Sequence, residues 1–137
     1  RVKQGFITGI LLLIAFGLLC STIMYLTANA SMAFMLGARE GTAFIQGTRY
    51  LQTISCFYVL CFVGNGLAGY FEGTGHVTVP MVGAAIHLTL RVILSWMFVG
   101  TAGLYAVSMA TGIGWLLLVL LWGSIYIIIS RKIRLSP

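Results

Sequence analysis

Acidic side chains are almost absent from the sequence. Its 137 residues include no Asp and only two Glu, Glu40 and Glu72, which we expect in different loops. Paired-carboxylate catalysis and hard-metal sites each need two or more clustered carboxylate oxygens. The residue pattern offers no nucleophile and base pair for another kind of catalysis. We therefore expect no enzyme, no catalytic residue and no cofactor.

Charge of either sign is scarce. Only 7% of the residues are charged, whereas 60% are hydrophobic. A soluble domain usually carries roughly a quarter charged residues, so a chain this apolar could not stay dispersed in water as a monomer. Its apolar residues form runs long enough to cross a membrane, which makes the lipid bilayer the first expected partner. The uncharged runs are 5–48, interrupted by Arg39 and Glu40, then 50–71, 73–90 and 92–130.

Cysteine is also sparse. Cys20, Cys56 and Cys61 form an odd set, and neither His76 nor His87 has the spacing of a zinc ligand to any of them. A zinc or redox pair is the alternative, but we interpret the three thiols as small apolar packing residues. No metal site is expected.

Four membrane-spanning helices account for the apolar runs, because roughly 20 helical residues cross a hydrocarbon core about 30 Å thick. Residues 100–103 provide a tight turn, and Pro80 fits the first turn of a helix, where its missing N–H is not needed. The expected fold class is an all-α membrane protein. The predicted spans are about 5–27, with an extension to Phe34 left open, then 50–70, 79–99 and 103–130.

The basic residues predict the orientation. Cytoplasmic loops carry an excess of Lys and Arg, so the side that holds both chain ends is expected to be cytoplasmic, in the plasma membrane. The formal net charge of +6 then requires no nucleic-acid partner. The residues on the cytoplasmic side are Arg1, Lys3, Arg131, Lys132 and Arg134, against Arg39 and Arg49 on the other.

Small residues at four-residue spacing predict two helix-packing faces, since helices in lipid associate through close contact rather than through hydrophobic burial. Contacts with a ligand are the alternative for either face. The two stripes are Gly5 and Gly9 in the first span, and Ala102, Ala106, Ala110 and Gly114 in the fourth.

The third span carries a polar face, because Gly83, His87, Arg91 and Ser95 follow one another at four-residue intervals. A charged Arg near the middle of a span is costly and normally faces a protein interior or a wet cavity. Arg91 therefore needs a partner, either in a transport site or as a brace between two helices. A proton relay through His87 is a further hypothesis.

A milder polar face lies on the second span, where Tyr58, Cys61 and Asn65 follow at helical spacing. Asn65 stands among apolar neighbours and needs a hydrogen-bonding partner. Gly64 and Gly66 flank it. These glycines either admit another helix or weaken this one enough to bend it, and packing is the favoured interpretation.

Residues 69–80, between the second and third spans, combine small residues, one charged residue, a Gly-x-Gly and a Pro. This segment resembles a loop of the multidrug and toxic compound extrusion (MATE) family, and its motif residues are Gly69, Glu72, Gly73, Gly75 and Pro80. Further likenesses in the family's order are residues 1–5, 50–51, 90–91, 103–107 and 112–115. The resemblance covers nearly the whole chain.

The resemblance implies the last four helices of a transporter with twelve helices, arranged as two similar halves around a central cavity. It also implies export of organic, often cationic compounds in exchange for Na⁺ or H⁺ by alternating access. The chain begins at Arg1 without Met and without the features of a signal peptide, so we expect it to be the C-terminal part of a longer protein.

The sequence departs from the family's pattern at three positions. Glu72 and His76 stand where many relatives have Arg and an acidic or amide residue, and Ile93 replaces a frequent Pro. Without that Pro, we expect a straighter third helix. None of the spans contains a carboxylate, so the coupling Na⁺ or H⁺ is expected to bind mainly in the rest of the protein.

Three other functions stay open beside the MATE-like antiporter. A lipid-linked saccharide flippase of the same superfamily would need several cations in its cavity, and only Arg91 lies within a span. A complete small multidrug transporter would need a Glu in the first span, which has none. A non-transporting membrane scaffold would use its polar faces only to lock helices together. For transport, the candidate cavity residues are Tyr58, Asn65, His87 and Arg91.

Overall fold

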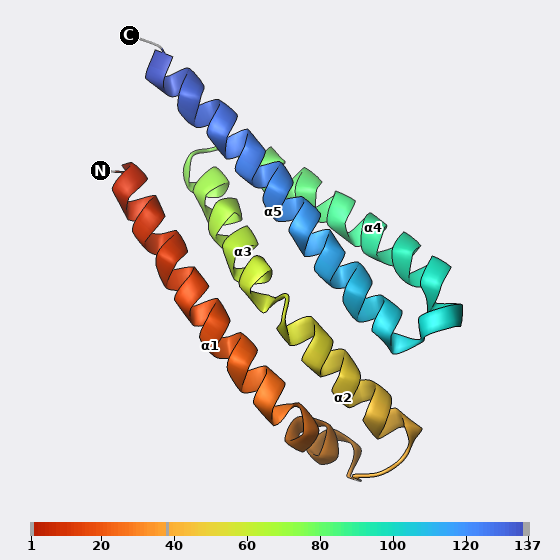
Figure 1. Ribbon diagram of the computed structural model, residues 1–137. Helices are drawn as coiled ribbons and strands as arrows, with labels where there is room; N and C mark the ends of the chain where they lie inside the picture. The colour runs from red at the N-terminus through yellow and green to blue at the C-terminus, as the bar shows by residue number, and fades with distance from the viewer. Residues whose placement is uncertain (1, 38, 136–137) are drawn as a thin grey trace.

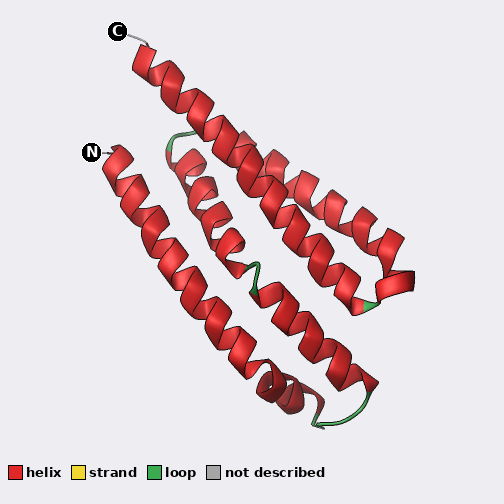
Figure 2. Ribbon diagram, in the orientation of Figure 1, coloured by secondary structure: helices red, strands yellow, loops and turns green. Residues whose placement is uncertain are grey.

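The computed structural model describes residues 2–37 and 39–135, with side chains over 4–37 and 39–130. All regular secondary structure in this part of the chain is α-helical (Figure 2), which confirms the expected fold class. The basic side chains at positions 1, 3, 131, 132 and 134, on which the predicted orientation rests, lie outside the described side chains. The helices are α1 (Val2–Leu36), α2 (Thr42–Ser55), α3 (Tyr58–Gly73), α4 (Thr78–Ala102) and α5 (Leu104–Leu135).

The helices form an elongated bundle in which α3 and α5 each pack against three others (Figure 1). α1 packs on α2 and α3, α5 packs on α2, α3 and α4, and α4 rests mainly on α5. The start of α1, the α3–α4 turn and the end of α5 lie at one end of the bundle, here called the terminal end, as an even number of spans requires (Figure 1). The α1–α2 loop and the α4–α5 turn lie at the other, the distal end.

Three helices are long and apolar enough to cross a membrane by themselves: Gln4–Leu36, Thr78–Ala102 and Leu104–Ser130. The pair formed by α2 and α3 passes the same test only when the two are taken together, with a bend of 48° between them. The described residues therefore hold three candidate spans, or four if the bent pair is one span. α4 is continuous through Ile93.

The structure corrects the prediction of one unbroken helix over 50–70. The helical segment begins earlier, at Thr42, and it breaks at Cys56 and Phe57. Neither Pro nor Gly stands at the break, so helix propensity does not predict it. Cys56 is exposed there, so it does not pack as the sequence predicted.

A side chain from α1 accounts for the break. The Ser21 hydroxyl donates a hydrogen bond of 2.6 Å to the Ser55 carbonyl, and Ser55 is fully buried. The Phe57 N–H donates to the Ile54 carbonyl. Regular helical hydrogen bonding resumes where the Cys61 N–H donates to the Phe57 carbonyl. An inserted side chain that satisfies a carbonyl from outside is a recognised cause of a helix kink. Ser21 therefore replaces the bond that a continuous helix would have made.

Glycines let the neighbouring helices reach the break. A Cβ atom at Gly17 of α1 would lie 3.1 Å from Cα of Val59, and one at Gly112 of α5 would lie 2.5 Å from Cε2 of Phe57. The break is thus held from both sides, because α1 and α5 approach more closely than any larger residue would permit.

The two predicted packing stripes have different outcomes. Ala106, Ala110 and Gly114 are buried, which confirms a packing face on α5, but Ala102 is exposed and ends α4, so it is not part of that face. A Cβ atom added at Gly5 or Gly9 would have no atom of another element within 4 Å, so their stripe is not a packing face among the described residues. Helix contact in α1 instead falls further along, at Gly17.

Replacing Ser21 by Ala should destabilise the protein, because the buried Ser55 carbonyl loses its hydrogen-bond donor. We expect a loss of about 1–3 kcal/mol, measured as a lower melting temperature in detergent. Thr22→Ala is the matched control, since the Thr22 hydroxyl bonds only to Leu18 in its own helix. Equal melting temperatures for the two variants would contradict the assigned role of Ser21.

Candidate functional site

The contact between α4 and α5 is built from two reciprocal pairs of a glycine and a ring. A Cβ atom at Gly83 of α4 would lie 2.7 Å from Cε2 of Trp122, and one at Gly114 of α5 would lie 2.5 Å from Cδ2 of His87. Each helix thus supplies one glycine and one ring to the same contact. This interlocked contact, called the α4–α5 seam below, fixes where His87 and Trp122 lie.

His87 is only 8% exposed and packs against a second ring from α5. The centroids of His87 and Trp115 are 4.9 Å apart, with an angle of 46° between the planes. Nε2 of His87 and Nε1 of Trp122 are buried without a hydrogen-bond partner among the described residues. Such unpaired polar atoms are uncommon in folded proteins, which makes this seam a candidate site.

A cavity of about 380 Å³ opens beside the seam, between α3, α4 and α5. Its wall combines two indole rings, an imidazole, an amide, a carboxylate and several apolar side chains. We call it the seam cavity. Its polar and aromatic lining residues are Asn65 and Glu72 of α3, His87 of α4, and Trp115 and Trp122 of α5.

Asn65 is held in place by its own helix. Its side-chain amide Nδ2 donates to the Cys61 carbonyl at 2.8 Å and lies 3.5 Å from the Cys61 Sγ. The partner that the sequence required is therefore one turn earlier in α3, and no bond to another helix is needed. The exposed amide is free to meet a ligand in the seam cavity.

The two glycines beside Asn65 mediate packing, as favoured from the sequence. A Cβ atom at Gly64 would lie 3.4 Å from Cζ3 of Trp115, and one at Gly66 would lie 2.6 Å from Cδ1 of Leu13 in α1. Trp115 is therefore fixed between α3 and His87. The bend in this helix pair occurs elsewhere, at Cys56 and Phe57.

The other two candidate residues lie outside the seam cavity. Tyr58 is in the first turn of α3, directly after the break, and it is half-buried. Arg91 is half-buried one turn along α4 from His87, and neither Glu forms an ion pair with it in the described part of the chain. The structure thus brings Asn65 and His87 together and leaves Tyr58 and Arg91 apart from them.

The motif over 69–80 is less of a loop than predicted. Gly69, Glu72 and Gly73 belong to α3, so Glu72 lies in a last helical turn rather than in a loop. The turn itself is formed around Gly75, whose φ of 79° is in the left-handed region that favours glycine. Pro80 is buried in the first turn of α4, as expected, and it lines the seam cavity together with Glu72.

Trp115 and Trp122 were not among the predicted site residues. Trp122 continues the four-residue stripe of Ala106, Ala110 and Gly114 and is only 4% exposed, whereas Trp115 directly follows Gly114 and lies about 100° round the helix from it. For Trp122 the stripe itself was the available signal, because a large ring on the same face as a row of small residues must point toward a neighbouring helix. The neighbour, α4, could not be named from the sequence.

The family model for MatE matches residues 1–97, which is most of the chain. The chain belongs to the MatE family. No curated protein matches the chain, and no solved structure matches it. The match includes α1, α2, α3 and most of α4, so it covers Asn65, Glu72 and His87. The likeness noted at 103–107 and 112–115 lies in or beside α5, beyond the matched residues.

Family membership makes this protein an integral membrane transporter of the MATE superfamily. The long apolar helices agree with that assignment. Within the MatE chain, the seam cavity is the place where residues of the matched region meet the two tryptophans of α5.

Replacing Gly114 by Ala should loosen the α4–α5 seam, because the added methyl group overlaps the His87 ring. We expect a loss of about 1–3 kcal/mol in stability, seen as a lower melting temperature in detergent. Gly123→Ala is the control in the same helix, since nothing lies within 4 Å of that position. A Gly114→Ala protein as stable as the Gly123→Ala protein would show that the seam is not tightly packed.

Proposed function

We propose that this MATE transporter is a secondary active antiporter that exports drugs and other xenobiotics, often organic cations, in exchange for Na⁺ or H⁺. The observation that carries the proposal is the composition of the seam cavity. Its lining joins indole rings and one carboxylate with neutral hydrogen-bonding groups, a combination suited to an aromatic cation.

Each kind of lining group has a part in binding such a compound. The Trp115 ring attracts a cation and stacks on a planar ring, and the buried Trp122 ring forms part of the apolar wall. The Glu72 carboxylate at the terminal end supplies the opposite charge, and Asn65 and His87 supply hydrogen bonds. The volume of about 380 Å³ falls in the usual range of small-molecule sites.

The coupling ion needs an anionic or titratable group within the membrane. Glu40 lies in the α1–α2 loop and Glu72 in the last turn of α3, so neither carboxylate is in the middle of a candidate span. We propose that Na⁺ or H⁺ binds mainly to other helices of the transporter. The chain would then supply four of twelve helices, with α2 and α3 together as one bent span, and both of its ends would be cytoplasmic in the plasma membrane.

The charge of the cavity also separates this function from its alternatives. A flippase for lipid-linked saccharides must bind a phosphate-bearing substrate, which calls for several cations, and the seam cavity is lined by neither Lys nor Arg. A non-transporting scaffold has no use for a cavity with unpaired polar atoms. A protein that exports no aromatic cation in the efflux measurements below would favour one of these two alternatives, the flippase or the scaffold.

Replacing Trp115 by Ala should slow export, because the substrate loses one ring face in the seam cavity. We expect about a five- to tenfold fall in efflux rate from the loss of stacking and cation–π attraction. Efflux of a fluorescent aromatic cation from cells with the full-length protein measures it. The control is Trp96→Ala, since Trp96 is 82% exposed on the outer face of α4. If the two variants slow efflux equally at equal protein level, the seam cavity is not the binding site.

Replacing Arg91 by Ala tests the candidate that lies outside the cavity. Because Arg91 is one turn from His87 and does not line the cavity, we expect a smaller fall in efflux than for Trp115→Ala. Arg91→Lys, which keeps the positive charge, should restore most of the loss. Efflux of the Arg91→Ala protein equal to that of the unmodified protein would remove Arg91 from the transport site.

A further inference from the structure

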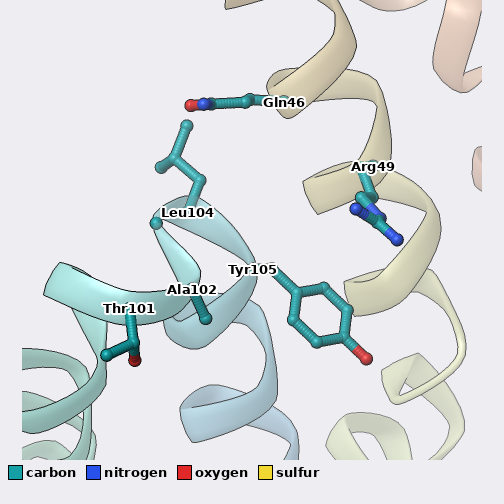
Figure 3. A pocket seen from close by; sticks show the side chains of 7 residues that line it. Gln46, Arg49, Thr101, Ala102, Leu104 and Tyr105 are labelled. Carbon is teal, nitrogen blue, oxygen red and sulfur yellow. The ribbon is translucent and has the colours of Figure 1, made fainter.

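A second cavity, of about 420 Å³, lies at the distal end of the bundle (Figure 3). It is formed by Gln46 and Arg49 of α2 and by residues 101–105 of the α4–α5 turn. It shares no residue with the seam cavity, so it is a separate site. We call it the distal cavity.

Arg49 is the charged group of the distal cavity. Its guanidinium carbon lies 5.5 Å from the centroid of the Tyr105 ring, and Figure 3 shows the two side chains side by side. The ring face attracts the cation and limits its orientation, but it supplies no counter-charge. Gln46 is on the same helix and extends toward Leu104 at the other side of the cavity (Figure 3).

The chain has little to offer Arg49 as an ion-pair partner. Glu72 lies at the terminal end of the bundle, where it lines the seam cavity. Glu40 is the other acid of the sequence, and the described side chains form no ion pair between it and Arg49. The guanidinium therefore has unused N–H donors beside an open cavity.

The chemistry of these donors favours a phosphate group. A guanidinium is a planar fork that binds phosphate oxygens through two parallel hydrogen bonds, and the Gln46 amide can donate another. The α4–α5 turn ends two candidate spans, which sets the cavity at the depth of lipid headgroups. Leu104, which lines the cavity, is an exposed apolar side chain that can contact acyl chains.

We infer that the distal cavity binds the phosphate group of an anionic phospholipid headgroup, held by Arg49 and Gln46 with Tyr105 fixing the guanidinium. The inference requires only that the chain spans a membrane. It does not depend on the exported substrate or on the coupling ion, and it concerns none of the residues of the seam cavity.

Native mass spectrometry of the full-length protein in detergent tests this site, with phosphatidylglycerol as the probe. Arg49→Ala should weaken phosphatidylglycerol binding about fivefold. Tyr105→Leu keeps the charge but removes the ring, and it should weaken binding less. It also provides a second variant if Arg49→Ala fails to fold. Diacylglycerol, which lacks phosphate, should show no dependence on Arg49.

Arg39→Ala is the matched charge control, because Arg39 is an exposed residue at the same end of the bundle and does not line the distal cavity. Two results together would support the site. Arg49→Ala alone should weaken phosphatidylglycerol binding, and millimolar inorganic phosphate should not displace this lipid from the unmodified protein. Unchanged binding by Arg49→Ala, or an equal loss with Arg39→Ala, would overturn it. Displacement of the lipid by inorganic phosphate would overturn the headgroup as the ligand and show that free phosphate binds instead.

Discussion

The rest of the structure depends on close approach between helices at glycine. Lipid tails are as apolar as the side chains, so these helices gain little by burying apolar surface against each other and must pack through contact and hydrogen bonds. Gly83 and Gly114 each receive a ring from the opposite helix, and this exchange holds α4 on α5. At the break between α2 and α3, Gly17 lets α1 approach Val59, and Gly112 lets α5 approach Phe57. A side chain at Gly83, Gly112 or Gly114 would overlap the ring that packs there, and one at Gly17 would press on the backbone of Val59.

The same contacts that hold the helices also create the site. His87 and Trp122 are fixed by the glycines opposite them, and Trp115 is fixed between Gly64 and His87. Because the rings occupy the seam, they leave a space beside it that reaches to Glu72 at the terminal end. Buried polar atoms without partners are normally costly, and two of them, Nε2 of His87 and Nε1 of Trp122, belong to rings that line this cavity.

The sequence was a good guide to what depends on local pattern and a poor one to what depends on contact between helices. Run lengths and glycines predicted the start of α4 and the turn at Gly103, because hydrophobic length and left-handed backbone are local properties, although α4 continues three residues beyond its predicted end. The break at Cys56 was not predictable, since its cause is a hydroxyl on another helix. His87 and Asn65 were found as polar residues in apolar runs. Trp115 was missed because a large ring in a span is ordinary until its neighbour is known.

The central claim is that the seam cavity is where this MATE transporter binds the compounds it exports. Photoaffinity labelling of the full-length protein with a photoreactive aromatic cation, followed by peptide mass spectrometry, tests it most directly. The account predicts labels on the peptides that contain Trp115 and His87, and protection of both by excess unlabelled cation. Protectable labels found only on other parts of the protein, with these two peptides unmodified, would contradict it.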